Sequence, residues 1–220
     1  MSSRPSPYIH FLLNVQPCIY RKCIFVLDCS IYIGAEFHLQ MSLMEYGYVW
    51  WMDTSVRVTE PKLEPVLRIA ESEGIVFSVN SDPKNILGIT KQTDLQTFDY
   101  LHEDPCLYRD YSESSATTLI VKSNPVTYAL VKAWAICALN KDCISPPGTK
   151  YKKVCNLTEQ TDGRCHRFDQ SVLSILTSRL FHERIRSGTH KNVLNTVIEV
   201  LRGQVTHYFE RCYLILKCLA

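Results

Sequence analysis

Short apolar runs alternate along the chain with segments in which apolar residues recur at helical spacing. The runs 48–52 and 75–79 are almost wholly apolar and predict buried strands. Between them, residues 61–72 carry apolar side chains at helical spacing, with Pro61 near the start and Gly74 just past the end, which predicts a helix. We therefore expect a strand, a helix and a strand in succession.

The same alternation continues toward the C-terminus. Residues 117–122 are rich in β-branched side chains and stop at Asn124-Pro125, which predicts a strand. A helix is expected to end over 41–46, further helices are predicted over 126–139, over 169–180 and within 192–216, and loops are predicted over 80–94 and 141–164. Strands that alternate with helices favour an α/β fold, with an open, mostly parallel sheet and flanking helices.

Composition and charge narrow the class of protein. With 220 residues, 46% hydrophobic and 21% charged, the chain is a globular domain of generous size, and disordered, collagen-like and coiled-coil classes are excluded. Its net charge of +2 is too near balance for a protein whose main partner is a nucleic acid or an anionic membrane. We therefore expect no nucleic-acid partner.

No segment is expected to span a membrane. A spanning helix needs about 20 apolar residues, and every stretch of that length contains charge or proline. The most apolar candidate, 23–37, carries Asp28 and Glu36, and Arg21-Lys22 precede it too late for a standard secretory signal. No signal peptide is evident in this chain.

The cysteines indicate an oxidising compartment. Ten cysteines are many for a reduced cytosolic protein of this size. Cys137, Cys143, Cys155 and Cys165 fall in one stretch that is otherwise built like a long loop, where at least one disulfide would replace missing core contacts, in any of three pairings. Free buried cysteines and a metal site are the alternatives, although the spacing lacks the close pairs of a zinc site.

A glycosylation triplet lies in the same predicted loop. Asn156-Leu157-Thr158 suits the surface of a lumenal glycoprotein. Together with the cysteines, it favours the secretory pathway, either the Golgi lumen or the extracellular space.

An acid directly follows the apolar run 48–52. In open α/β sheets ligands bind beyond the carboxyl ends of the strands, so Asp53 is a candidate site residue. Its neighbours Thr54, Ser55 and Arg57 add two hydroxyls and a guanidinium, a set suited to a divalent cation and a diphosphate. The alternative is that Asp53 and Thr54 only form an Asx-type turn at a strand end.

A second polar group precedes the predicted helix 169–180. Asp169 is placed to cap this helix, and His166 could ligate a metal or move a proton. A helix N-terminus flanked by His166, Arg167 and Gln170 is also a ready anion site. A simply capped helix without a ligand is the alternative.

These motifs resemble those of GT-A type glycosyltransferases. Residues 48–56 resemble the strand and the Asp-x-Asp motif that binds metal and nucleotide sugar, with Ser55 in place of the second acid. Residues 113–122 resemble the strand that lines the donor-sugar pocket, and residues 168–173 resemble the late Asp-Gln helix.

Three motifs, 50–55, 137–139 and 165–171, are similar in combination to an uncharacterised animal protein family related to these transferases. The order and spacing agree over about residues 41–185. The resemblance implies a GT-A-like domain over 41–185, an atypical N-terminal segment over 1–40 and a C-terminal helical segment over 186–220. Because few residues precede Asp53, it also implies a partial, N-terminally incomplete domain.

The activity implied by the resemblance is transfer of a sugar from a nucleotide diphosphate sugar to a glycan or protein acceptor. Asp53, with His166 or Asp169, would hold Mn²⁺ or Mg²⁺, and Arg57 would take up charge on the departing diphosphate. Glu113 or Asp169 would orient the donor or act as base on the acceptor hydroxyl.

Cofactor binding would also involve Ser55 and Gln170, which lie in the matching motifs. The alternative function is a catalytically inactive lumenal or secreted α/β domain that acts as a binding module. A hydrolase finds no support, because the sequence lacks G-x-S-x-G, H-E-x-x-H and P-loop motifs.

Overall fold

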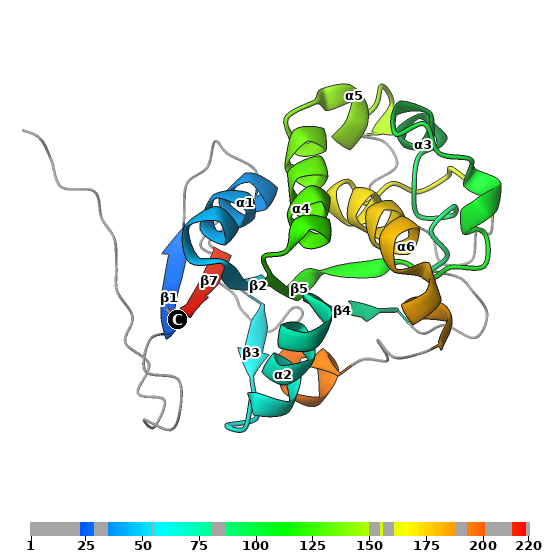
Figure 1. Ribbon diagram of the computed structural model, residues 1–220. Coiled ribbons are helices and arrows are strands. Elements are labelled where there is room, and N and C mark those ends of the chain that lie inside the picture. The colour runs from blue at the N-terminus through cyan, green and yellow to red at the C-terminus, as the bar shows by residue number, and fades with distance from the viewer. Residues whose placement is uncertain are drawn as a thin grey trace, which may run out of the picture.

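The computed structural model describes residues 23–28, 35–53, 55–80, 87–149, 155, 161–187, 193–200 and 213–218. Five strands form the main sheet in the order β1-β7-β2-β5-β4, and two more strands form a small sheet (Figure 1). The strands are β1 (Cys23–Asp28), β2 (Tyr48–Asp53), β3 (Val56–Val58), β4 (Ile75–Val79), β5 (Ser114–Lys122), β6 (Ile198–Val200) and β7 (Tyr213–Cys218). The helices are α1 (Ala35–Tyr46), α2 (Glu64–Glu73), α3 (Leu95–Tyr100), α4 (Pro125–Ala138), α5 (Lys141–Ile144) and α6 (Asp169–Ser187), with short 3-10 helices η1 (Pro105–Tyr108) and η3 (Leu194–Thr196).

The expected α/β class is confirmed, but the expectation of a mostly parallel sheet is wrong for the described strands. Every strand pairing in this part of the chain is antiparallel. β2 and β4 do point in the same direction, as the strand-helix-strand pattern predicts, yet β5 lies between them and runs the opposite way. A local hydrophobic pattern carries no information on which strand will be inserted between two others, or in which direction.

The strand directions bring polar residues to one edge of the sheet. The carboxyl ends of β2 and β4 and the amino end of β5 meet there, because β5 is antiparallel to both neighbours. Asp53 ends β2, Asn80 follows β4 and Glu113 precedes β5. Val79 pairs with Ser114, so the next residues outward, Asn80 and Glu113, stand opposite each other.

Both faces of the sheet are buried. Helices α1, α4 and α6 lie on one side and α2 with η3 on the other (Figure 1). Along β2 the side chains alternate between the two cores, since Trp51 packs with the first group and Trp50 with the second. A strand buried on both faces has no polar side, which explains the unbroken apolar run 48–52.

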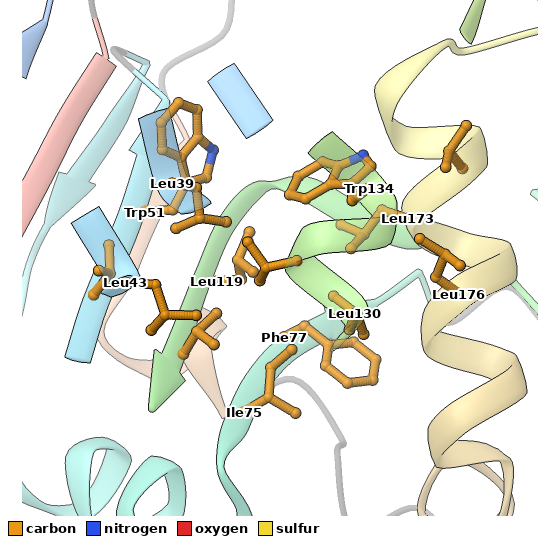
Figure 2. Packing of buried hydrophobic residues seen from close by; sticks show 14 of the residues in the cluster. Leu39, Leu43, Trp51, Ile75, Phe77, Leu119, Leu130, Trp134, Leu173 and Leu176 are labelled. Carbon is orange, nitrogen blue, oxygen red and sulfur yellow. The ribbon is translucent and has the colours of Figure 1, made fainter. Parts of the chain in front are cut away.

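Large aliphatic and aromatic side chains from three helices fill the first core (Figure 2). Trp134 on α4, Leu173 on α6 and Leu39 on α1 approach the sheet from different directions and are all fully or almost fully buried. This core holds the first turns of α1 and α6 against the sheet, at the edge where the polar residues gather.

The glycine signal at the end of α2 is confirmed, and the structure adds a cap at the start of α4. Gly74 ends α2 with φ of 80° and donates its N–H to the Ala70 carbonyl oxygen at 2.8 Å. Asn124 caps α4, where its Oδ1 accepts hydrogen bonds from the N–H groups of Val126 and Thr127 at 2.9 Å each.

The predicted helix within 192–216 is wrong for the residues described there. This region forms η3, β6 and β7 instead. β6 pairs with β3, and β7 lies between β1 and β2. Distant strands supply these hydrogen bonds, and periodicity within the segment cannot register them. α1 packs in the first core and β7 pairs with β2, although both include residues outside 41–185; the proposed domain boundaries stay a prediction.

Two disulfides confirm the expectation of at least one bridge among the clustered cysteines. Cys137 is bonded to Cys143, and Cys155 to Cys165. The first joins the last turn of α4 to α5, and the second anchors the segment that leads into α6. Asn156-Leu157-Thr158 lies outside the described residues. Among the helices that the structure describes, none combines the length and apolar character needed to cross a membrane.

Replacing Gly74 should damage two helix ends at once. A Cβ at this position would lie 2.2 Å from Asn124 Nδ2, and φ of 80° is itself unfavourable for alanine. We expect Gly74→Ala to lower the free energy of unfolding by about 2 kcal/mol, from backbone strain plus the damaged cap. Gly47→Ala is the matched control, since Gly47 has φ of 69° but open space around it. Equal losses for the two variants in urea unfolding would show that the cap of α4 is not involved.

The two bridges should be visible in protein recovered from the secretory pathway. Alkylation without reduction should leave the four bridged cysteines unmodified, because a disulfide sulfur does not react as a thiolate. Cys106, which is free and exposed, should be labelled in the same sample and serves as the internal control. Mass spectrometry of the peptides reads both results. Labelling of all four clustered cysteines would contradict the oxidised state and the lumenal assignment.

Candidate functional site

Asp53 is fixed by a local turn at the end of β2. Its Oδ1 accepts a hydrogen bond from the N–H of Ser55 at 2.9 Å, which is the Asx-type turn considered from the sequence. The residue is partly buried, and Ser55 is buried beside it. Thr54 lies outside the described residues.

Arg57 stands on the small sheet and is exposed. Its Nη1 donates to the Val56 carbonyl oxygen at 2.8 Å, and in the β3–β6 pairing it lies opposite Glu199. Its expected contact with a diphosphate stays a prediction.

Glu113 is the most enclosed acid at the sheet edge, with 1% of its surface exposed. Its Oε1 accepts hydrogen bonds from Asn80 Nδ2 at 2.9 Å and from Arg167 Nη1. The main chains join as well, because the Asn80 N–H donates to the Glu113 carbonyl oxygen at 2.9 Å. Oε2 is buried and has no hydrogen-bond partner of ordinary geometry among the described residues.

Two opposing effects act on the Glu113 carboxyl group. Burial raises its pKa, since the charged form loses its hydration. The positive charge of Arg167 and the side-chain donors of Gln170 and Asn80 pull the pKa back down. Glu113 and Gln170, both expected from the sequence to contribute to a site, are therefore joined in one network through the first turn of α6.

Asp169 is the first residue of α6 and reaches the same edge. Its main-chain oxygen accepts a hydrogen bond from Trp134 Nε1 at 3.0 Å, which ties the start of α6 to α4. Burial raises the pKa of its carboxyl group, the Gln170 N–H and the Arg167 charge oppose this, and the charge of Asp53 raises the pKa further. Asp53 and Asp169, more than a hundred residues apart in the sequence, thus lie close enough for their charges to interact.

Glu36 is a fourth acid in this group and was not expected from the sequence. After Gly47 the chain reverses between α1 and β2, and α1 packs along that strand. Twelve helical residues span about 18 Å and six strand residues about 20 Å, so the first turn of α1 reaches the Asp53 end of β2. Burial, with a smaller contribution from the charge of Asp169, raises the pKa of Glu36 to about 7.

His166 forms hydrogen bonds to two other segments of the chain, at the start of α3 and at the end of α5. Its Nδ1 accepts a hydrogen bond from the Asp94 N–H at 3.1 Å, and Nε2 lies 3.0 Å from the Ile144 carbonyl oxygen. The ring is 1% exposed. Its role as a metal ligand stays a prediction, and ligation would require one of these two bonds to open.

The acids at the edge do not form a complete metal cage. Within the described residues, no three His, Cys, Asp or Glu side chains come close enough together to hold a metal ion by themselves. One or two carboxylates can still bind Mg²⁺ or Mn²⁺ when water and phosphate oxygens complete the coordination, which is the usual arrangement for nucleotide sites. Asp53 and Asp169 fit this incomplete donor set.

Two residues of the site were absent from the expected set: Glu36 and Asn80. Asn80 carried a usable signal, because it directly follows a predicted strand whose carboxyl end reaches the same edge as Asp53. Arg167 was expected as part of an anion site at the helix start, and its ion pair with Glu113 was not predicted. Glu36 lies within residues 1–40, which were expected to form an atypical N-terminal segment.

No known protein family, curated protein or solved structure matches the chain.

The raised pKa of Glu36 should make stability depend on pH. In the folded chain this carboxyl group keeps its proton up to about pH 7, whereas its ordinary pKa is 4.5, so the wild type loses stability as pH rises between these values. We expect Glu36→Gln to be more stable than wild type at pH 8 by up to about 3 kcal/mol, and equal to it at pH 4. Urea unfolding at both pH values measures this.

Glu45→Gln is the matched control for this pH experiment. Glu45 is exposed in the last turn of the same helix, so its replacement should produce no comparable pH-dependent difference. A Glu36→Gln variant that tracks the wild type at both pH values would contradict the assigned burial of the Glu36 charge.

Proposed function

We propose that the chain is a glycosyltransferase-like protein that transfers a sugar from a nucleotide diphosphate sugar to a glycan or protein acceptor. One observation carries the proposal: Asp53, Glu113 and Asp169, three acids from distant parts of the sequence, gather at one edge of a sheet that is otherwise covered on both faces. The resemblance of the surrounding motifs to GT-A type transferases gives this gathering its chemical interpretation.

Asp53 and Asp169 are the residues that would hold Mn²⁺ or Mg²⁺. Each carries hard carboxylate oxygens, and the interaction between their charges is unfavourable in the absence of a cation. A bound divalent ion would neutralise developing charge on a departing diphosphate. Arg57 and Ser55 are proposed to contact the nucleotide side of the same site, and Gln170 the sugar side.

Glu113 and Asp169 are the candidates to orient the donor or to accept a proton from the acceptor hydroxyl. Glu113 already shares Oε1 with Asn80 and Arg167, and Oε2 is buried, so a substrate would reach Oε2 only after the surrounding side chains move. Burial raises the pKa of Asp169, which makes its carboxylate a better proton acceptor than an ordinary aspartate. We propose that the protein acts in the secretory pathway, which is in line with the two disulfides.

A second candidate function is a lumenal or secreted binding module without catalysis. The observation that favours it is the engagement of the expected site residues by the protein itself: both ring nitrogens of His166 and one carboxylate oxygen of Asp53 already have main-chain partners. In this case the acids at the edge are remnants of a pocket, and a surface of the domain carries the function.

Binding of nucleotide diphosphates in the presence of Mn²⁺ tests the proposal. Calorimetric titration of the oxidised chain with UDP and with GDP should detect binding of at least one of them that disappears when Mn²⁺ is chelated. Asp53→Asn keeps an oxygen for the Ser55 N–H and removes the charge, so it should preserve the fold and weaken this binding roughly tenfold or more.

Asp99→Asn is the matched control, since Asp99 is an exposed acid on α3. It should bind like the wild type. Absence of Mn²⁺-dependent binding in the folded wild type would reject the transferase and leave the binding module as the better interpretation.

A further inference from the structure

His166 bridges two loops that come from different parts of the chain. A main-chain N–H can only donate and a carbonyl oxygen can only accept, so the bonds to Asp94 and Ile144 require a neutral ring with its proton on Nε2. Asp94 itself caps α3, where its Oδ1 accepts from the Gln96 N–H at 2.9 Å. His166 therefore ties the start of α6 to the start of α3 and to the end of α5.

Phe168, two residues after His166, has an unusual main-chain conformation. Its φ is 51°, in the left-handed region that a bulky side chain seldom adopts because it strains the main chain. The Phe168 ring meets the His166 ring edge-on, with 5.0 Å between the centroids and 71° between the planes. The contact between the rings offsets part of the strain and holds the turn in place.

Phe168 lies between two charged residues of the site, Arg167 and Asp169. Arg167 on one side of Phe168 pairs with Glu113, and Asp169 on the other side begins α6 near Asp53. Ser171 braces the turn from below, because its Oγ accepts from the Arg167 N–H at 2.9 Å and donates to the Gln92 carbonyl oxygen at 2.7 Å. A relaxed main chain at Phe168 would redirect one or both charged side chains.

We infer that His166 is a positioning residue: with Phe168 it locks the left-handed turn that presents Arg167 to Glu113 and Asp169 to the sheet edge. This inference rests on the proposed function for its consequence in ligand binding, but the lock itself is a property of the fold. It assigns His166 to the support of the site instead of to the coordination of a metal.

Two variants test the lock. Phe168→Gly removes the ring, and glycine adopts φ of 51° without strain. We therefore expect this variant to fold even if His166→Ala does not. His166→Ala removes both bridging hydrogen bonds. In each variant, hydrogen exchange of the amides in residues 169–173 should accelerate about tenfold more than exchange in α4, because the start of α6 loses its support. His182→Ala, at an exposed site on α6, is the matched control.

The second measurement is the affinity for Mn²⁺ of the variants that remain folded. A positioning role predicts a several-fold loss in Phe168→Gly with little change in thermal stability. If the wild type binds Mn²⁺ and Phe168→Gly binds it equally, the positioning role is overturned while the proposed function stands. If the wild type binds no Mn²⁺, the metal of the proposed function is rejected, and the exchange experiment alone decides the role of His166. Exchange in 169–173 that rises no faster than in α4 overturns the inference.

Discussion

The insertion of β5 between β2 and β4 is the constraint on which the rest of the site depends. Because β5 runs against both neighbours, its beginning meets their ends at one edge of the sheet. Glu113 is thereby set against Asn80, and both share an edge with Asp53. The helices cover the faces of the sheet with apolar side chains. The polar side chains therefore meet where the strands end.

Electrostatics at this edge are unbalanced toward negative charge. Glu36, Asp53, Glu113 and Asp169 are distributed along this edge, and the charge of Arg167 acts on both Glu113 and Asp169. Burial is the largest cause of the raised pKa values, with a smaller contribution from neighbouring carboxylates for Glu36 and Asp169, and a bound proton removes the unfavourable charge. A divalent cation would serve the same end, which connects the fold to the proposed nucleotide chemistry. The unfavourable charge costs stability that the two cores must offset.

The segment that leads into α6 is held by disulfides, by the hydrogen bonds of His166 and by main-chain hydrogen bonds. Disulfides fix Cys143 and Cys165, which directly precede Ile144 and His166, the two ends of one hydrogen bond. Main-chain bonds from Gly163 to Thr90 and from Cys165 to Lys91 bind the same segment to a second loop. A strained residue such as Phe168 persists only where its surroundings over-determine it, and these contacts provide that condition.

The sequence by itself determined those features that depend on neighbours along the chain. The buried strands, the end of α2 at Gly74, the acid at the end of β2 and the tendency of the clustered cysteines to bond all follow from residues a few positions apart. Tertiary structure alone decided the direction of β5, the strands in place of a C-terminal helix, the burial of Glu36 and the use of both nitrogens of His166. These depend on partners tens of residues away, because strand pairing and desolvation are set by which surfaces meet, and periodicity within one segment does not encode its partner.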